Sequence, residues 1–198
     1  ENLLSDLLEV SRFDAQVATL SLDQVDAISL VRRCVDDLGI SSKEKATQFH
    51  LSCPENPVIL EADSRRLERI MRNLLANAID HSEGKPIHVT INENETAVSI
   101  SVRDYGVGLT ESQIERVFDR FWRADPSRSR ERGGTGLGLA IAKEDALLHG
   151  GVIKVWGELG KGSNFVLTLP KISGSSFAEF PLSEIPASEI PTSEIPTK

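Results

Sequence analysis

Two glycine clusters in this chain flank a segment rich in aromatic and basic residues. Asp104 leads the first cluster, Asp104-Tyr105-Gly106-Val107-Gly108. The second cluster reads Gly133-Gly134-Thr135-Gly136-Leu137-Gly138-Leu139, and residues 118–123 between them hold aromatic rings and arginines. Glycine lets the backbone approach a ligand closely, and runs of backbone N–H groups bind anions. This stretch therefore predicts a backbone shaped around a phosphorylated ligand.

Single residues here match the demands of a nucleoside triphosphate. The ionised carboxylate of Asp104 would only accept hydrogen bonds, which suits the exocyclic amine of adenine. Asn77 offers an amide oxygen, and Mg²⁺ takes such oxygens while it keeps phosphate and water in its octahedral shell. Gly136 and Gly138 precede a helix whose N-terminal N–H groups and dipole favour phosphate. Each feature is common alone, so the order of all of them along the chain carries the prediction.

Two common nucleotide motifs are missing. Residues 160–163, Gly-Lys-Gly-Ser, have a glycine directly after the lysine and lack the upstream glycine spacing of a Walker loop. The second glycine cluster lacks the wider final gap of the dinucleotide fingerprint. The pattern therefore favours neither a P-loop nor a Rossmann site.

A regular helix is predicted over residues 64–82, with Asp63 as its N-cap. Its apolar residues recur at spacings of three and four, as on a helix that packs against a core. A second side of the same helix is polar and includes both asparagines, which are poor helix formers and need a reason. The apolar side holds Leu67, Ile70, Met71, Leu74, Leu75, Ala78 and Ile79, and the polar side holds Asn73, Asn77, Asp80 and His81.

Periodicity predicts the remaining elements. Val98, Ile100 and Val102 form the buried side of a strand that delivers Asp104, and the tip at residues 92–95 suits a hairpin with the strand before it. A break is expected at residues 19–26. Strands are expected over residues 47–52, 58–60, 87–92, 97–103, 152–156 and 164–169, and further helices over 28–46, 111–118 and 136–149.

The two ends of the chain differ from this core. Residues 2–20 have the apolar stripe of an amphipathic helix, which either packs on its own domain or, as we favour, forms half of a helical hairpin or bundle. Ser-Glu-Ile-Pro occurs three times after residue 182 with a period of five, and proline in every repeat opposes helix and sheet. Residues 173–198 are therefore expected to be a disordered tail, either a passive extension or a docking or phosphorylation segment.

The composition argues against several classes of protein. A net charge of -8 opposes a nucleic-acid partner, because phosphate backbones are held by clustered Lys and Arg. Cys34 and Cys53 match no zinc or disulfide spacing, so both are interpreted as buried small hydrophobes. No apolar run approaches the roughly 18 residues of a membrane span, and no signal peptide is present. Since the first residue is Glu1 rather than Met, we expect a piece of a longer chain.

The order of these motifs resembles that of the catalytic, ATP-binding domain of bacterial sensor histidine kinases, over residues 64–170. Four motifs carry the resemblance, which makes it highly specific. They are the N box at residues 73–78, the first glycine box at 104–109, the F box at 118–123 and the second glycine box at 134–139. Residues 80–81 and 121–127 further look like the actinobacterial MtrB type of this family.

The resemblance implies an α/β fold, the two-layer sandwich of the Bergerat ATP-binding type, in which helices back a mixed sheet. Residues 1–22 would be the second helix of a dimerisation domain, residues 23–170 the catalytic ATP-binding domain and residues 171–198 the tail. ATP and Mg²⁺ are the implied ligands. An ATP lid would lie between the F box and the second glycine box.

The resemblance also implies roles for single residues. Asn77 would bind Mg²⁺, Asp104 would read adenine with help from Ser163, and Asn73 and His81 would line the phosphate side. Asn73 and Asn77 are the expected catalytic pair. Gly106 and Gly108 would form the adenine floor. Phosphate contacts are expected from Gly134, Thr135, Gly136, Leu137, Gly138 and Arg123, and the lid residues Arg128, Arg130 and Arg132 either assist there or form a solvated loop.

The chain departs from the family's pattern in two ways. Asp80 stands where the family often has a lysine, so a direct phosphate contact is in doubt there. The family's phosphoacceptor histidine is followed by an acidic residue, but none of this chain's four histidines is. The acceptor is therefore expected upstream of Glu1, and His149 is interpreted as a helix-end residue.

Three functions are compatible with this pattern. The first is the catalytic portion of a two-component sensor kinase, which passes the γ-phosphoryl group of Mg-ATP to a histidine on an upstream helix, in cis or in trans within a homodimer. A response regulator's receiver domain would then take the group, and the portion would be cytoplasmic, anchored to the inner or plasma membrane only by upstream segments. The second is an ATP-driven clamp, which Asn73 opposes because such enzymes have a glutamate there. The third is a non-catalytic nucleotide-sensing module.

Overall fold

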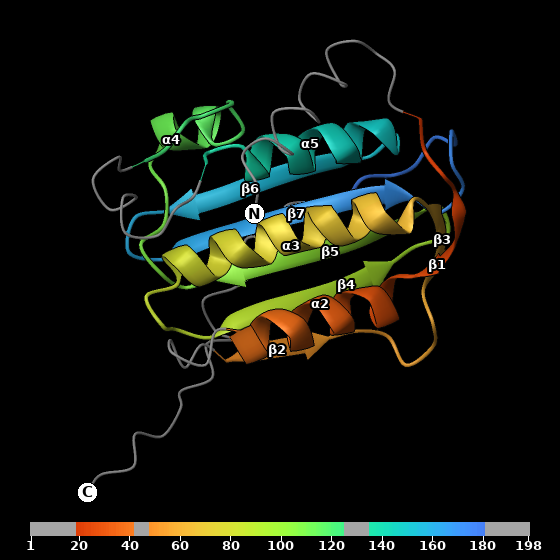
Figure 1. Cartoon of the computed structure of the whole chain (residues 1–198), viewed down its shortest axis with the longest axis horizontal. Coiled ribbons are helices and arrows are strands. Elements are labelled where there is room, and N and C mark those ends of the chain that lie inside the picture. Colours follow the sequence, from red (N-terminus) through yellow and green to blue (C-terminus); the bar gives the residue numbers. More distant parts are fainter. Residues whose placement is uncertain (1–18, 42–47, 125–134, 181–198) are drawn as a thin grey trace, which may run out of the picture.

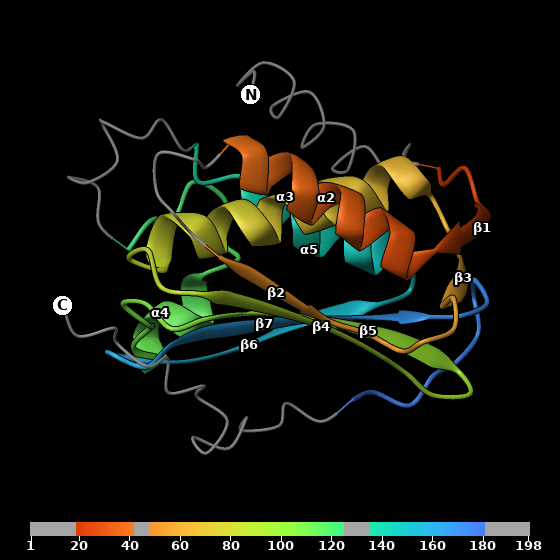
Figure 2. The same ribbon diagram turned by 90° about the horizontal axis from the view of Figure 1, so that it is seen from below.

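The computed structural model describes residues 19–41, 48–124 and 135–180. In this part of the chain, helices α2 (Ala27–Ser41), α3 (Ser64–His81) and α5 (Gly138–Leu148) lie side by side on one face of a single large sheet (Figures 1 and 2). A short helix, α4 (Glu111–Arg116), contacts the edge strand β6. The expected two-layer α/β sandwich is confirmed.

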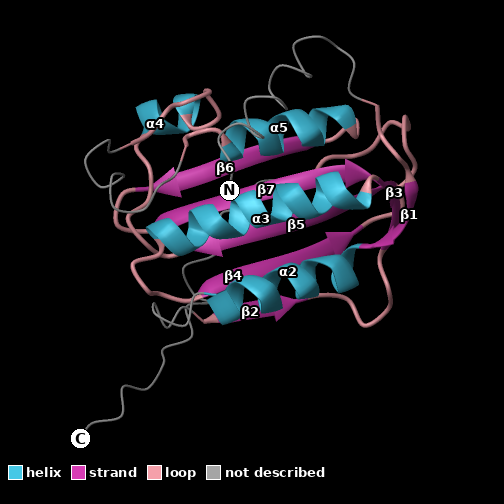
Figure 3. Ribbon diagram, in the orientation of Figure 1, coloured by secondary structure: helices cyan, strands magenta, loops and turns pink. Residues whose placement is uncertain are grey.

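The large sheet is mixed. Its strands are β2 (Phe49–Ser52), β4 (Ile87–Glu93), β5 (Ala97–Asp104), β7 (Gly162–Pro170) and β6 (Val152–Glu158), given in their order across the sheet (Figure 3). β2 is parallel to β4 and every other neighbouring pair is antiparallel. The parallel pair follows from the long connection through α3, which returns the chain to the starting end of the sheet.

A small second sheet was not expected. β1 (Asp23–Asp26) pairs antiparallel with β3 (Ile59–Ala62), where the sequence predicts a break over residues 19–26. The local sequence of β1 is mostly polar and gives no strand signal. The strand forms because a segment more than thirty residues away supplies its partner, and the backbone N–H of Ala27 adds a bond of 2.9 Å to the carbonyl of Val58.

Helix boundaries follow the local chemistry. The carboxylate of Asp63 caps α3 by accepting hydrogen bonds from the backbone N–H groups of Arg65 and Arg66, as predicted. α4 opens with a capping box between Thr110 and Gln113 and is shorter than expected. α5 begins at Gly138 and not at Gly136, because Gly136 has a φ of 72°, which a right-handed helix cannot use.

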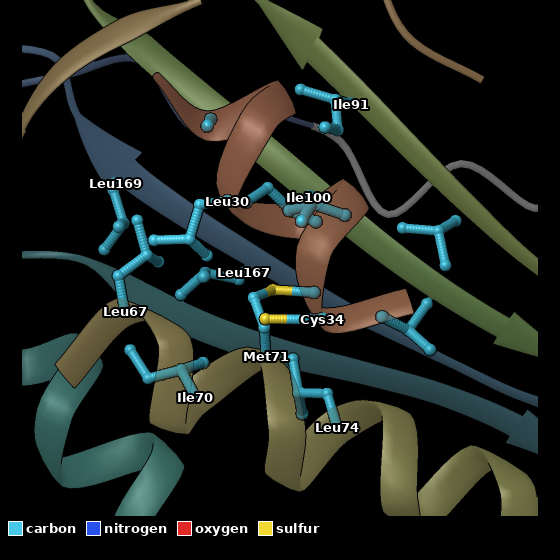
Figure 4. Close-up of a cluster of buried hydrophobic side chains, with 14 of the residues drawn as sticks. Leu30, Cys34, Leu67, Ile70, Met71, Leu74, Ile91, Ile100, Leu167 and Leu169 are labelled. Atoms are coloured by element: carbon cyan, nitrogen blue, oxygen red, sulfur yellow. The ribbon is translucent and has the colours of Figure 1, made fainter. Parts of the chain in front are cut away.

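The core lies between the helices and the sheet. Figure 4 shows Leu67, Ile70, Met71 and Leu74 of α3 near Ile100 of β5 and near Leu167 and Leu169 of β7, with Leu30 and Cys34 of α2 beside them. The predicted apolar side of α3 is therefore confirmed. The interpretation of the cysteines is confirmed for Cys34 and wrong for Cys53, which is only partly buried because it follows the edge strand β2.

Several sequence predictions lie outside the described residues. They are the amphipathic helix at 2–20 apart from its last two residues, the continuation of α2 over 42–46, Gly134, the lid arginines and the Ser-Glu-Ile-Pro repeats. Within the described ranges, no helix combines the length and hydropathy that crossing a bilayer requires.

Candidate functional site

Asp104 is the best-anchored polar group of the site. It ends β5 with 1% of its surface exposed, and its Oδ1 accepts a hydrogen bond of 2.9 Å from the backbone N–H of Gly106. Its Oδ2 accepts from both the backbone N–H (3.2 Å) and the hydroxyl of Ser163. A carboxylate has about four lone-pair sites, so these three bonds orient the group and leave acceptor capacity for a ligand.

The backbone around Asp104 is packed too tightly for side chains. A Cβ on Gly106 would lie 1.8 Å from the carbonyl oxygen of His81, and one on Gly162 would lie 2.1 Å from the carbonyl oxygen of Asp104. Gly108 has a φ of 72°, and a Cβ there would meet the Glu158 carbonyl at 1.9 Å. The first glycine cluster is thus wedged between the end of α3 and the β6-β7 turn, which gives each glycine a steric reason.

Helix α3 joins the two glycine clusters. Asn73 and Asn77 are partly buried and one turn apart on it. A Cβ on Gly138, the first residue of α5, would lie only 3.1 Å from Oδ1 of Asn73. At the far end of α3, the His81 carbonyl accepts from the N–H of Val107 at 3.2 Å. His81 itself is exposed, and its backbone adjoins the first cluster, the side that the resemblance assigns to the base rather than to phosphate.

The second glycine cluster packs against the backbone of the F box. The Gly136 carbonyl accepts a bond of 2.9 Å from the N–H of Phe121, and a Cβ on Gly136 would lie 2.9 Å from the Phe121 carbonyl carbon. Phe121 has a φ of 63°, a conformation that bulky residues rarely adopt. The Thr135 hydroxyl accepts from the N–H of Leu137, which is fully buried. Residues that are distant in sequence therefore hold the start of α5 in place.

The N-terminus of α5 can receive an anion. Its N-cap residue, Leu137, provides no side-chain hydrogen bond to the first turn. The N–H groups of a first turn have no partner within the helix, and the helix dipole places partial positive charge there. In the part of the chain that the structure describes, this end of α5 therefore has the electrostatics that phosphate needs, next to Asn73.

Two further predicted positions adjoin the site only in sequence. Arg123 is partly buried and directly follows Trp122, which packs against the core. Gly134 and the lid arginines lie outside the described residues.

A shallow hollow of about 260 Å³ on the outer side of α3 meets the predicted site only at Asn73, and its other lining residues are Arg65, Glu68, Arg69 and Arg72.

Sequence reasoning missed the residues that fasten α5 to α3. Asp145 of α5 is completely buried and pairs with Arg66 and Arg69 of α3. His149, which caps α5 as predicted, has its Nδ1 2.7 Å from the Asp145 carbonyl oxygen, and its Nε2 accepts from the N–H of Asp63 at 3.0 Å. An acidic residue at an otherwise apolar position of α5 was the available signal for this contact.

Comparison with known proteins agrees with this geometry. Residues 62–173 match the family model described as histidine kinase-, DNA gyrase B-, and HSP90-like ATPase. The chain is 51% identical over 182 residues to the sensor histidine kinase MtrB of Mycolicibacterium paratuberculosis, which covers 92% of this chain and 32% of that protein. It is 37% identical over 173 residues to the sensor histidine kinase WalK of Bacillus subtilis, covering 85% of this chain and 28% of WalK. The chain thus spans about a third of the length of the curated relatives it matches.

Solved structures agree as well. Full-length ShkA in complex with AMPPNP superposes with a TM-score of 0.76 at 30% identity, covering 88% of this chain and 36% of ShkA. The catalytic domain of the histidine kinase ThkA superposes with a TM-score of 0.69 at 25% identity, covering 78% of this chain and 98% of that domain. The family model spans more than half of the chain, and the predicted resemblance is confirmed, including its MtrB type. The chain belongs to the family of histidine kinase-, DNA gyrase B- and HSP90-like ATPases.

Proposed function

We propose that this chain is the catalytic, ATP-binding portion of a two-component sensor histidine kinase. It would bind Mg-ATP and deliver the γ-phosphoryl group to a histidine on a separate helix. The observation that carries the proposal is that α3 contacts both glycine clusters: Gly106, whose N–H donates to Asp104, packs against the His81 backbone, and Gly138, at the uncapped start of α5, packs against Asn73. This arrangement supports a base reader at one end and a phosphate site at the other.

Each residue would have a distinct task. Asp104, oriented by Ser163 and Gly106, would accept a hydrogen bond from the adenine amino group. The first N–H groups of α5 would bind phosphate oxygens. Asn73 lies against Gly138 and would position the phosphate chain beside them. Positioning and electrostatic stabilisation are what phosphoryl transfer chiefly requires from a protein.

The site has few candidate protein ligands for a metal ion, and Mg²⁺ needs only one or two. Among the described residues, no group of three or more His, Cys, Asp or Glu side chains is placed to hold a metal ion. Mg²⁺ commonly binds through one or two protein oxygens, substrate phosphates and several waters. The partly buried Asn77 amide oxygen would be the protein ligand, and the bound ion would neutralise charge on the phosphates.

The phosphoacceptor histidine would come from another segment, in cis or in trans within a homodimer. Both ring nitrogens of buried His149 are hydrogen-bonded, and the rings of His50 on β2 and His88 on β4 contact each other at an interplanar angle of 46°. His81 is exposed but is not followed by an acidic residue. A response regulator's receiver domain would take the phosphoryl group afterwards. We further propose that this portion works in the cytoplasm, with any membrane anchor in segments outside this chain.

A clamp-type ATPase is not supported. Such an enzyme needs a glutamate one turn before the magnesium asparagine to activate water, and Asn73 occupies that position. The amide of Asn73 cannot accept the proton. We therefore expect no appreciable ATP turnover without an acceptor.

Titration calorimetry with ATP, with and without Mg²⁺, tests the site. Asp104→Ala should weaken ATP binding about 10- to 100-fold in both conditions, because the hydrogen bond from the base to a charged acceptor is lost. Asn77→Ala should weaken binding only when Mg²⁺ is present. The exposed Asn92→Ala serves as a matched control and should bind like the parent chain. Unchanged Mg-ATP affinity in both site variants would overturn the assignment.

Phosphotransfer needs a second experiment. With γ-labelled ATP, this chain alone should remain unlabelled, and a supplied helix that carries a histidine followed by an acidic residue should become labelled. Label on this chain alone would refute the separate acceptor. ATP binding without label on the supplied helix would instead favour a nucleotide-sensing module.

A further inference from the structure

Two histidines outside the candidate ATP site lie side by side on the open face of the large sheet, the face opposite the helices. His50 of the edge strand β2 pairs in register with His88 of β4, the strand next to it (Figure 3). The residues that alternate with them along the two strands pack into the core, namely Phe49, Leu51, Ile87 and Val89. Because successive side chains of a strand point to opposite faces, His50 and His88 share the open face.

The spacing of the two rings suits a shared metal ion. Their centroids lie 4.8 Å apart at an interplanar angle of 46°. A transition metal lies about 2.0–2.1 Å from an imidazole nitrogen, so two imidazoles on one ion have centroids roughly 4.5–5.2 Å apart at bond angles of about 90–110°. The spacing of His50 and His88 falls in this range. Rotation about χ2, which is a soft torsion in histidine, is enough to aim both rings at one ion.

The ring nitrogens of this pair are accessible. His50 is exposed and His88 is partly exposed. In the part of the chain that the structure describes, neither ring has a hydrogen-bond partner, and no nitrogen of His88 is both buried and unpaired. Both ring nitrogens of His149, by contrast, are hydrogen-bonded in the interior. The pair on the open face therefore keeps lone pairs that a ligand from solvent can reach.

The surroundings of His88 favour its neutral form. Burial lowers the pKa of His88 below its ordinary value, and the positive charges of His50 and of Arg103, its register partner on β5, lower it further. His88 is therefore neutral at pH 7, and a neutral imidazole has the lone pair that binds a metal. Two protonated histidines directly opposite each other would instead repel.

The same surroundings select the kind of ion. Within the described ranges, no third His, Cys, Asp or Glu joins the pair, and the next residue across the sheet is the cation Arg103. Mg²⁺ and Ca²⁺ bind through oxygen ligands and commonly through carboxylates, which are missing from the pair. Imidazole nitrogens suit Zn²⁺, Cu²⁺ and Ni²⁺. The pair is thus suited to a late transition metal and not to the ion proposed for the ATP site.

We propose that His50 and His88 together bind one divalent transition-metal ion of the Zn²⁺, Ni²⁺ and Cu²⁺ class on the open face of the sheet. One ring nitrogen of each histidine would bind the ion, and water would fill its remaining positions. With two protein ligands, the site would bind more weakly than structural zinc sites, which have four. The bound ion would fasten the edge strand β2, which pairs only with β4, to the rest of the sheet. The site is separate from the proposed ATP site and does not depend on it.

The test is a Zn²⁺ titration of the whole chain, followed through the imidazole nitrogens of its four histidines in ¹H–¹⁵N NMR. One ring nitrogen of His50 and one of His88 should shift together, along a single binding curve. The signals of His81 and His149 should stay in place. Excess Mg²⁺ should not change this result, because Mg²⁺ prefers oxygen ligands. A shift of His50 without His88, for example through binding at the nearby Cys53, would overturn the proposal.

Variants give an independent measurement by calorimetry. His50→Ala and His88→Gln should each weaken Zn²⁺ binding about tenfold or more, since each removes one of the two protein ligands. Asn92→Ala, on the same face of β4, is the matched control and should bind Zn²⁺ like the parent chain. Thermal unfolding without metal checks that all three variants fold. Unchanged Zn²⁺ affinity in folded His50→Ala would overturn the proposal, whatever the outcome for Mg-ATP.

Discussion

Arg69 donates two hydrogen bonds to the buried carboxylate of Asp145, from Nε to Oδ2 at 2.8 Å and from Nη2 to Oδ1 at 2.9 Å. Arg66 adds a third bond of 2.8 Å. These bonds join α5 to α3 across 76 to 79 residues of sequence. Because α3 carries Asn73 and α5 begins at Gly138, the ion pairs hold together the two helices on which the candidate phosphate site depends.

Asp145→Ala should lower the free energy of unfolding by about 2–4 kcal/mol, because it leaves two guanidinium groups without their buried counter-charge. Urea denaturation at pH 7 measures this loss. The neighbouring Glu144 provides the control, since its 3.7 Å pair with Arg120 is partly exposed and Glu144→Gln should cost less than about 1 kcal/mol. Equal costs for the two variants would contradict the structural role of Asp145.

Gly106→Ala should disrupt the first glycine cluster, because its Cβ would collide with the His81 carbonyl oxygen at 1.8 Å. We expect destabilisation of about 2 kcal/mol or more, of the size that overpacking causes. Gly39→Ala is the matched substitution inside α2, where the nearest atom, on Phe49, is 4.0 Å away. It should instead stabilise the chain by about 0.5–1 kcal/mol, since alanine favours helix. Thermal unfolding of both variants should show opposite shifts in Tm.

The cap of α3 should make stability depend on pH. Burial raises the pKa of the Asp63 carboxyl, but hydrogen bonds from the backbone of Ser21 and Arg66 outweigh burial, so the pKa is lowered overall. A lowered folded-state pKa stabilises the protein above the unfolded value of about 3.9, and this contribution disappears as the pH falls through the folded value. Asp63→Ala should therefore cost about 1–2 kcal/mol at pH 7 and less at pH 3.

Urea titrations at both pH values provide the measurement for Asp63. The exposed Asp36→Ala on α2 should change stability by no more than about 0.5 kcal/mol at either pH. A cost for Asp63→Ala that stays constant between pH 7 and pH 3 would show that the charge of the carboxylate does not contribute.

The two cysteines should differ in reactivity. Burial, with the nearby negative charge of Glu68, raises the pKa of the Cys34 thiol to about 11. At pH 8 its thiolate fraction is on the order of one in a thousand, and the thiolate is the reactive species. Iodoacetamide should therefore modify the partly exposed Cys53 first, and mass spectrometry of the digested chain measures the order. In urea, where both thiols are exposed, the two cysteines should be modified at equal rates. Equal modification rates of Cys34 and Cys53 in the folded chain as well would contradict the burial of Cys34.

Local patterns in the sequence were sufficient for the elements that local chemistry controls. Helix α3 follows from its apolar spacing and the Asp63 cap, and the β4-β5 hairpin follows from alternation on each side of a polar tip. The order of the four motifs was specific enough to indicate the family. The helix and hairpin signals each lie within about twenty residues, and the motifs are read from their order along the chain, so none of them requires knowledge of the fold.

Tertiary structure decided what depends on distant partners. β1 is a strand only because β3 lies beside it, and the burial of Asp145 depends on arginines of a different helix. The approach of Gly138 to Asn73, and the pairing of Arg103 on β5 with Asn164 on β7, likewise arise from how helices and strands are placed side by side. Such contacts leave little trace in a sequence, because the packing that makes them favourable exists only after the chain has folded.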